Sequence, residues 1–211
     1  MVQMMTNGVY RFCEWVTRLA FLNILWIAFS VAGLLILGFF PATAALFSVT
    51  RRWTMGEHDI PVFQTFWTAY KKAFWRSNQL GLLIVVPAVM FAANFMIIEQ
   101  YGSPVPMMPY VLTSFFLLYG VVALFLFPVY VHYNVTMKKT VKYALVIGLL
   151  RPVQTVIMVA SLLGMAYIMM QHITFVLFFS GSAFGFVLMW FAMNAFDAVA
   201  RKQEEAALQQ T

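Results

Sequence analysis

The sequence predicts an all-α fold, a polytopic helical bundle in a membrane, on two observations. Of the 211 residues, 63% are hydrophobic and 9% are charged, whereas soluble domains are nearer half apolar and a quarter charged. The second is a set of long runs without any charged residue: 19–50, 77–98, 100–137 and 152–196. Because about 20 apolar residues in a helix cross a bilayer, three runs allow one crossing and the last allows two. The runs are continuous rather than alternating, which excludes a spanning β-barrel.

We therefore expect a single membrane domain over residues 1–211, with about five transmembrane helices. The expected spans are about 19–40, 80–98, 109–131, 152–170 and 173–195. Between the last two lies the polar pair Gln171-His172, which suits a tight external turn.

The net charge of +6 is placed as membrane topology requires. Basic residues lie between spans one and two (Arg51, Arg52, Lys71, Lys72, Arg76), between three and four (Lys138, Lys139, Lys142) and after five (Arg201, Lys202). The positive-inside rule then puts these stretches and the C-terminus in the cytoplasm and the N-terminus outside, although this leaves Arg11 and Arg18 on the outer side. We expect a multi-pass protein of the cell membrane that contacts anionic lipid, with no nucleic acid partner.

Amphipathic patterns predict interfacial helices beside the spans. Residues 1–18 form one such helix, running into the first span. In the 41–79 connection, Pro41 is expected to break or start a helix, followed by a short helix over 42–55 that ends near Gly56. The helix that follows, 62–76, carries aromatic residues on one face and polar or basic residues on the other, which suits the headgroup level. The predicted partner- or lipid-docking residues are Arg51, Arg52, Trp53, Lys71, Lys72 and Arg76.

Glu57, His58 and Asp59 have the side chains needed for a metal site or for proton transfer. Three consecutive residues do not easily converge on one ion, and no second cluster lies in an obvious partner position. We interpret the triplet as a solvated turn, in which Glu57 and Asp59 can pair with neighbouring arginines. A membrane enzyme that acts on lipid or glycan through these residues is a third, weaker hypothesis.

Polar and small residues inside the spans indicate how the helices meet. Asn23, Asn94 and Asn194 are expected to make interhelical hydrogen bonds, and the alternative is that they line a polar path through the membrane. Gly181 and Gly185 form a GxxxG step, interpreted as helix packing within the monomer. A homo-oligomer is left open.

Catalysis and driven transport have little support in the sequence. It contains no HExxH, Ser/His/Asp or P-loop pattern, and no span has a central charged residue of the kind that ion-coupled transporters commonly carry. One cysteine, Cys13, rules out an internal disulfide and a cysteine-based metal cluster. We expect no catalytic, cofactor-binding or metal-binding residues, no cofactor and no enzyme activity.

Residues 8–85 resemble the YesL family of bacterial membrane proteins. The resemblance is carried by "LNILW" in the first span, "FPATAALFSVTRRWTMGE" after it, and "FWTAYKKAFWRSNQLG" at the entry to the second. It implies a carbohydrate-utilisation context, since genes of this family commonly lie beside those for polysaccharide breakdown and ATP-driven sugar import. It implies no catalytic residue.

Together these features predict a non-catalytic accessory membrane subunit associated with ATP-driven oligosaccharide import. Its partners would be the lipid membrane and the permease or ATPase subunits of a sugar importer. The alternative is a stand-alone small-solute channel or facilitator.

Overall fold

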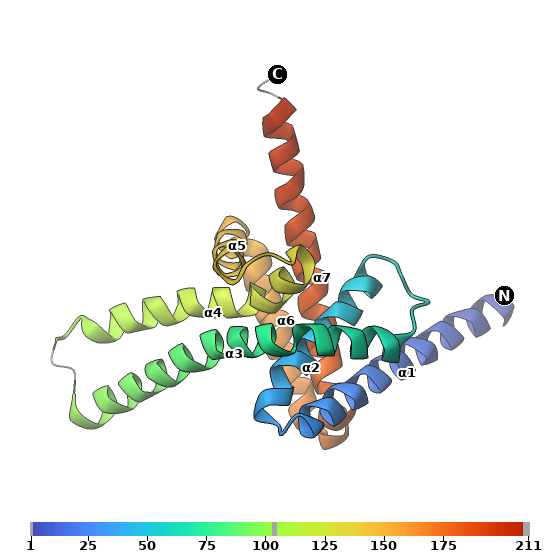
Figure 1. The fold of residues 1–211 in the computed structure, drawn as a ribbon, viewed down its shortest axis with the longest axis horizontal. Coiled ribbons are helices and arrows are strands. Elements are labelled where there is room, and N and C mark those ends of the chain that lie inside the picture. Colours follow the sequence, from blue (N-terminus) through green and yellow to red (C-terminus); the bar gives the residue numbers. More distant parts are fainter. Residues whose placement is uncertain (1, 103–104, 209–211) are drawn as a thin grey trace.

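The computed structural model describes residues 2–102 and 105–208, and these form helices joined by short connections (Figure 1). The helices are α1 (Val2–Ala32), α2 (Ile36–Thr54), α3 (Val62–Tyr101), α4 (Met108–Tyr133), α5 (Met137–Leu150), α6 (Pro152–Gln171) and α7 (Ile173–Leu208). Five of them, α1, α3, α4, α6 and α7, are long and apolar enough to cross a membrane. The all-α, multi-pass class predicted from composition is therefore confirmed.

The first predicted span is wrong in its second half. Residues 19–40 do not form one helix, because α1 ends at Ala32 and the chain reverses at Gly33, Leu34 and Leu35 before α2 begins. Both leucines have a left-handed backbone, with φ of 61° and 58°. Backbone N–H groups through this turn donate to nearby carbonyls, such as Gly33 to Phe29 (3.1 Å) and Leu35 to Ser30 (2.9 Å). An entirely apolar sequence can therefore turn here without leaving these donors unpaired.

The reversal brings together two segments that were predicted to lie on opposite sides of the membrane. Arg18 on α1 donates to the carbonyl of His58 and to the carboxylate of Asp59 (3.2 Å) in the loop after α2. An outside N-terminus and a cytoplasmic 41–79 connection place these residues on opposite sides of the membrane, so the two predictions cannot both hold.

Pro41 neither breaks nor starts a helix, contrary to prediction, and lies inside α2, which begins at Ile36. A proline has no N–H and leaves the carbonyl four residues earlier without its helical donor. Here that carbonyl belongs to Leu37, and the side-chain amide of Asn78 on α3 donates to it at 3.0 Å. The neighbouring helix thus supplies the hydrogen bond that the proline removes.

The central helix of the protein is α2, which packs against α1, α3, α4 and α7. Ten of its 19 residues are buried. Its two sides enter different clusters: Ala45 and Trp53 pack with α1 and α3, whereas Ala44 and Phe47 pack with α3 to α7. Small residues at these positions let several backbones approach closely.

The predicted interfacial helix 62–76 and span 80–98 form one continuous helix, α3, of 40 residues. Beyond its contacts with α2, α3 runs beside α4 away from the other helices (Figure 1). The hydroxyl of Tyr119 on α4 donates to the Ile84 carbonyl on α3, joining the two along this arm.

Two predicted breaks occur where expected. One helix ends at Leu150 and the next begins at Pro152, and α6 and α7 meet at His172. Gly181 and Gly185 of α7 pack closely against other helices. A Cβ added at Gly181 would lie 2.6 Å from Trp26 of α1, and one added at Gly185 would meet Leu46 of α2. The prediction that this GxxxG step packs within the monomer is confirmed.

Candidate functional site

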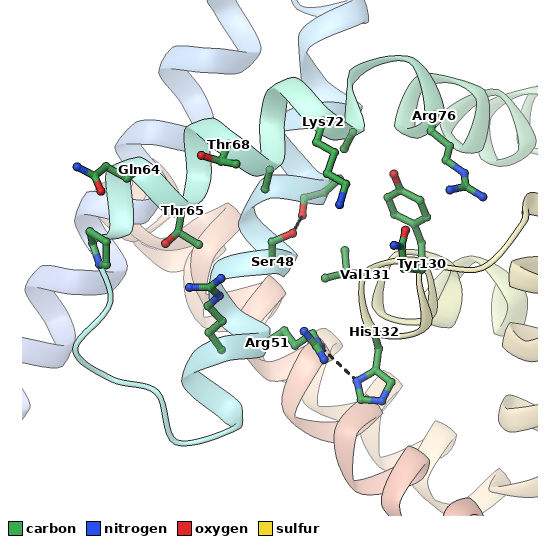
Figure 2. A pocket seen from close by; sticks show the side chains of 16 residues that line it. Ser48, Arg51, Gln64, Thr65, Thr68, Lys72, Arg76, Tyr130, Val131 and His132 are labelled. Atoms are coloured by element: carbon green, nitrogen blue, oxygen red, sulfur yellow. Dashed lines mark hydrogen bonds between the residues drawn. The ribbon is translucent and has the colours of Figure 1, made fainter.

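A basic cleft lies between α2, the first half of α3 and the last turn of α4, with a volume of about 600 Å³. Each helix contributes polar side chains at helical spacing, because the opposite face of each is buried in the core. In Figure 2, Lys72 reaches from α3 into the space between Ser48 of α2 and Val131 of α4, while Arg51 and His132 meet below it. The polar and charged lining comprises Ser48, Arg51, Arg52, Gln64, Thr65, Thr68, Lys72, Arg76, Tyr130, His132 and Asn134.

The arginines of this cleft are held mostly by neutral groups. Arg51 donates from Nε to His132 Nδ1 at 3.3 Å, which requires that nitrogen to be unprotonated. Arg76 donates to the Val135 carbonyl at 2.7 Å, and its guanidinium carbon lies 5.8 Å from the centre of the Tyr130 ring. These contacts orient the guanidinium groups without neutralising their charge.

A carboxylate approaches the lining cations at one place only among the described residues. Glu57 lies 4.0 Å from Arg52, with both side chains about half exposed, and a solvated pair at that distance is weak. No Asp or Glu is part of the cleft lining.

The predicted docking set separates into three places. Arg51, Arg52, Lys72 and Arg76 line the cleft, so the structure brings these four together. Trp53 is only 2% exposed and packs edge-on against Trp15, with ring centroids 5.6 Å apart, so it belongs to the core and is not available for docking. Lys71 lies outside the cleft, its ammonium 4.7 Å from the centre of the Trp67 ring.

The Glu57-His58-Asp59 turn packs against α1. Arg18 holds Asp59, Arg52 lies near Glu57, and the His58 ring meets Trp15 edge-on. The predicted pairing of the two carboxylates with arginines is confirmed, although Arg18 comes from a distant part of the sequence. Over residues 2–102 and 105–208, no group of three or more His, Cys, Asp or Glu side chains has a metal-binding arrangement.

The three asparagines predicted for a polar path do not share a cavity in the described structure. Asn23 is fully buried; its oxygen accepts from the Gly181 (2.8 Å) and Ser182 (3.1 Å) N–H groups, and its amide donates to the Leu177 carbonyl (2.7 Å). This amide therefore binds α1 to α7. Asn94 donates to Met90 on its own helix, and Asn194 lines a separate cavity of about 440 Å³ beside Asp197 and Arg201.

Sequence reasoning missed the α4 contribution to the cleft. Tyr130, His132 and Asn134 lie at the end of a charge-free run, where apolar character dominates the pattern. The available signal was topological, because the predicted end of span three lies on the same side of the membrane as the 41–79 connection.

Comparison with known proteins places the chain in a family. Residues 19–95 match the family described as "Protein of unknown function, DUF624". Over 206 residues the chain is 40% identical to "Uncharacterized protein YesL" of Bacillus subtilis (strain 168), covering 97% of both proteins. It is also 32% identical to "Uncharacterized protein YesV" of the same organism, over 95% of this chain and 97% of the relative.

A third relative, "Uncharacterized protein YteU" of Bacillus subtilis (strain 168), is 32% identical over 85% of this chain and 81% of its own length. No solved structure matches significantly. Since the match to YesL runs almost from end to end and includes the residues of the cleft, the chain belongs to the YesL family of multi-pass membrane proteins.

Proposed function

We propose that this protein is a non-catalytic accessory subunit of the cell membrane, associated with an ATP-driven carbohydrate importer. The proposal rests on its membership of the YesL family, together with the carbohydrate-utilisation context that the sequence resemblance implies. The structural observation that supports it is an exposed surface on the first half of α3, none of whose residues lines the basic cleft.

This surface, the aromatic ridge, consists of Phe63, Trp67, Lys71 and Trp75, which follow one another at four-residue spacing along α3. The exposed fraction is 50% for Phe63 and 80% for Trp75. Large aromatic side chains are enriched where proteins bind partners. The partner that fits this ridge is an importer subunit presenting an apolar surface with an acidic rim.

The proposal includes a placement in the membrane, which the contacts of Arg18 support. The 55–61 loop and the C-terminus belong in the cytoplasm by the positive-inside rule. Because Arg18 contacts His58 and Asp59, we infer that the segment of α1 around Arg18 lies on the cytoplasmic side as well. This arrangement removes the exception that Arg11 and Arg18 present to an outside N-terminus.

Photo-cross-linking in native membranes tests the docking proposal. A benzoylphenylalanine at Trp75 is expected to capture a permease or ATPase subunit of a sugar importer. The matched control is the same probe at Tyr110, which is 73% exposed on α4 and lies outside the ridge. If Trp75 yields the same adducts as Tyr110, with no importer subunit at either position, the proposal fails.

The channel alternative has no specific observation in its favour, because its three asparagines lie apart.

A further inference from the structure

The basic cleft holds positive charge that the chain itself does not neutralise. Four cationic side chains, Arg51, Arg52, Lys72 and Arg76, line it, with no carboxylate among its walls. Like charges gathered in one cavity repel each other, more strongly as water is displaced. An arrangement of this kind is costly when empty and favours a bound anion.

Lys72 is the cation of the cleft that the described residues leave without a partner. Its ammonium has no hydrogen-bond or ion-pair partner among the described residues, whereas the adjacent Lys71 stacks on Trp67. Figure 2 shows the Lys72 side chain directed into the cavity rather than outward. The hydroxyl of Thr68, one turn earlier on the same face, also lines the cavity and has no partner among these residues.

The cleft offers donors from two helices to an oxyanion with several oxygens. The Arg51 guanidinium comes from α2, and Lys72 and Arg76 come from α3. Guanidinium groups bind phosphate or carboxylate through paired N–H donors, and lysine adds a point charge. A phosphate monoester carries a charge of about −1.5 to −2 and three acceptor oxygens. It can therefore neutralise several cations on two helices better than a singly charged carboxylate can.

We propose that this cleft binds a phosphate group, carried either by a membrane lipid headgroup or by a soluble phosphate ester. The cavity volume of about 600 Å³ exceeds the space of a single phosphate and leaves room for the group that bears it. The site is distinct from the docking surface of the preceding section, because none of the residues of the aromatic ridge lines the cleft. Each proposal can therefore fail without the other.

Binding measurements on the purified full-length protein test this site in two arms. In detergent, titration with inorganic phosphate and with glycerol 3-phosphate is followed by calorimetry. In nanodiscs, the melting temperature is compared between pure phosphatidylcholine and phosphatidylcholine containing phosphatidic acid. Binding in the first arm without stabilisation in the second identifies a soluble ester, whereas stabilisation by phosphatidic acid identifies a lipid headgroup.

The variants Lys72→Gln and Thr68→Val are expected to weaken phosphate binding, Lys72→Gln by tenfold or more. Both side chains are exposed, so the fold should remain intact by circular dichroism. Lys139→Gln removes the same charge from an exposed position on α5, outside the cleft, and is expected to change the affinity less than twofold.

Three results would overturn the assignment. The first is no binding in either arm. The second is equal loss of affinity in Lys72→Gln and Lys139→Gln, which would reflect net charge alone. The third is affinity for glucuronate that matches or exceeds the affinity for the phosphate probes, which would make the site a carboxylate site.

Discussion

The two halves of α3 are built for different surroundings although they form one uninterrupted helix. In residues 62–81 six positions are buried against the protein, and three basic residues lie on the same stretch. In residues 82–101 no position is buried, and the single charged residue is Glu99. The more apolar half is thus the half that the protein leaves bare. The composition of the bare half suits contact with lipid, whereas the packed half is buried against α2 and the helices around it.

The difference explains where the protein can carry polar groups. The packed half turns one face to the core and is left with two others, the cleft and the aromatic ridge. The bare half faces the bilayer rather than the protein on most sides. A polar group there would meet hydrocarbon, where it is costly. The basic cleft consequently ends where the charge-free run 77–98 begins.

The largest expected effect comes from emptying the packed half. Phe66 is fully buried and contacts Phe29 and Tyr70, so Phe66→Ala should lower the free energy of unfolding by about 3–5 kcal/mol. Phe95 in the bare half is 37% exposed, and Phe95→Ala is its matched control, with an expected loss less than half as large. Unfolding in mixed micelles measures both, and equal losses would remove the distinction between the halves.

A charge placed in the bare half should disturb membrane insertion. Val89 is 61% exposed on α3, and a lysine near the centre of a spanning helix costs about 2.5–3.5 kcal/mol on insertion scales. We expect Val89→Lys to reduce the fraction of α3 that inserts, measured by translocation of a downstream reporter. Trp75→Lys, in the packed half, should insert like wild type. Normal insertion of Val89→Lys would show that this half does not lie in hydrocarbon.

The junction between the halves tolerates no added side chain. A Cβ at Gly81 would overlap the Phe40 ring, whereas a Cβ at Gly120 of α4 meets nothing within 4 Å. Gly81→Ala should therefore destabilise the protein by about 1–3 kcal/mol through overpacking. Gly120→Ala should be neutral or slightly stabilising, because alanine favours a helix over glycine. Thermal melting in detergent checks the pair, and a stabilised Gly81→Ala would show that α2 and α3 are not packed this closely.

The smallest effect separates the two outer faces of the packed half. Lys71 lies over Trp67, so Lys71→Ala should cost about 0.5–1 kcal/mol of stability. Lys72→Ala should cost no stability, because the Lys72 ammonium has no partner among the described residues. Its removal also reduces the repulsion among the cations of the cleft. If chemical denaturation gave the opposite order, the assignment of these neighbours to different faces would be wrong.

Much of this architecture could be predicted from local chemistry. The break before Pro152 and the polar pair Gln171-His172 both mark helix ends in the sequence. The turn at Leu34 and Leu35 could not be predicted, since nothing in an unbroken apolar run distinguishes a reversal from a continuing span. Pro41 gave a false signal because its effect depends on Asn78, a residue on another helix.

The candidate site could be predicted in part for the same reason. The four basic side chains of the cleft stood out against a charge-poor chain. Trp53 lies in the core instead of the cleft, and His132 joins the cleft lining. Both outcomes depend on how α1, α2 and α4 meet. Those contacts are tertiary, and a pattern of residues along one helix does not contain them.

Scanning of α3 by cysteine labelling in a lipid bilayer tests the central claim most directly, because Cys13 is the single native cysteine and Cys13→Ser supplies a clean background. A membrane-impermeant maleimide should label exposed positions of residues 62–76 in periodic order and leave residues 82–98 unlabelled until detergent is added. Equal labelling of both stretches in the intact bilayer would contradict the account.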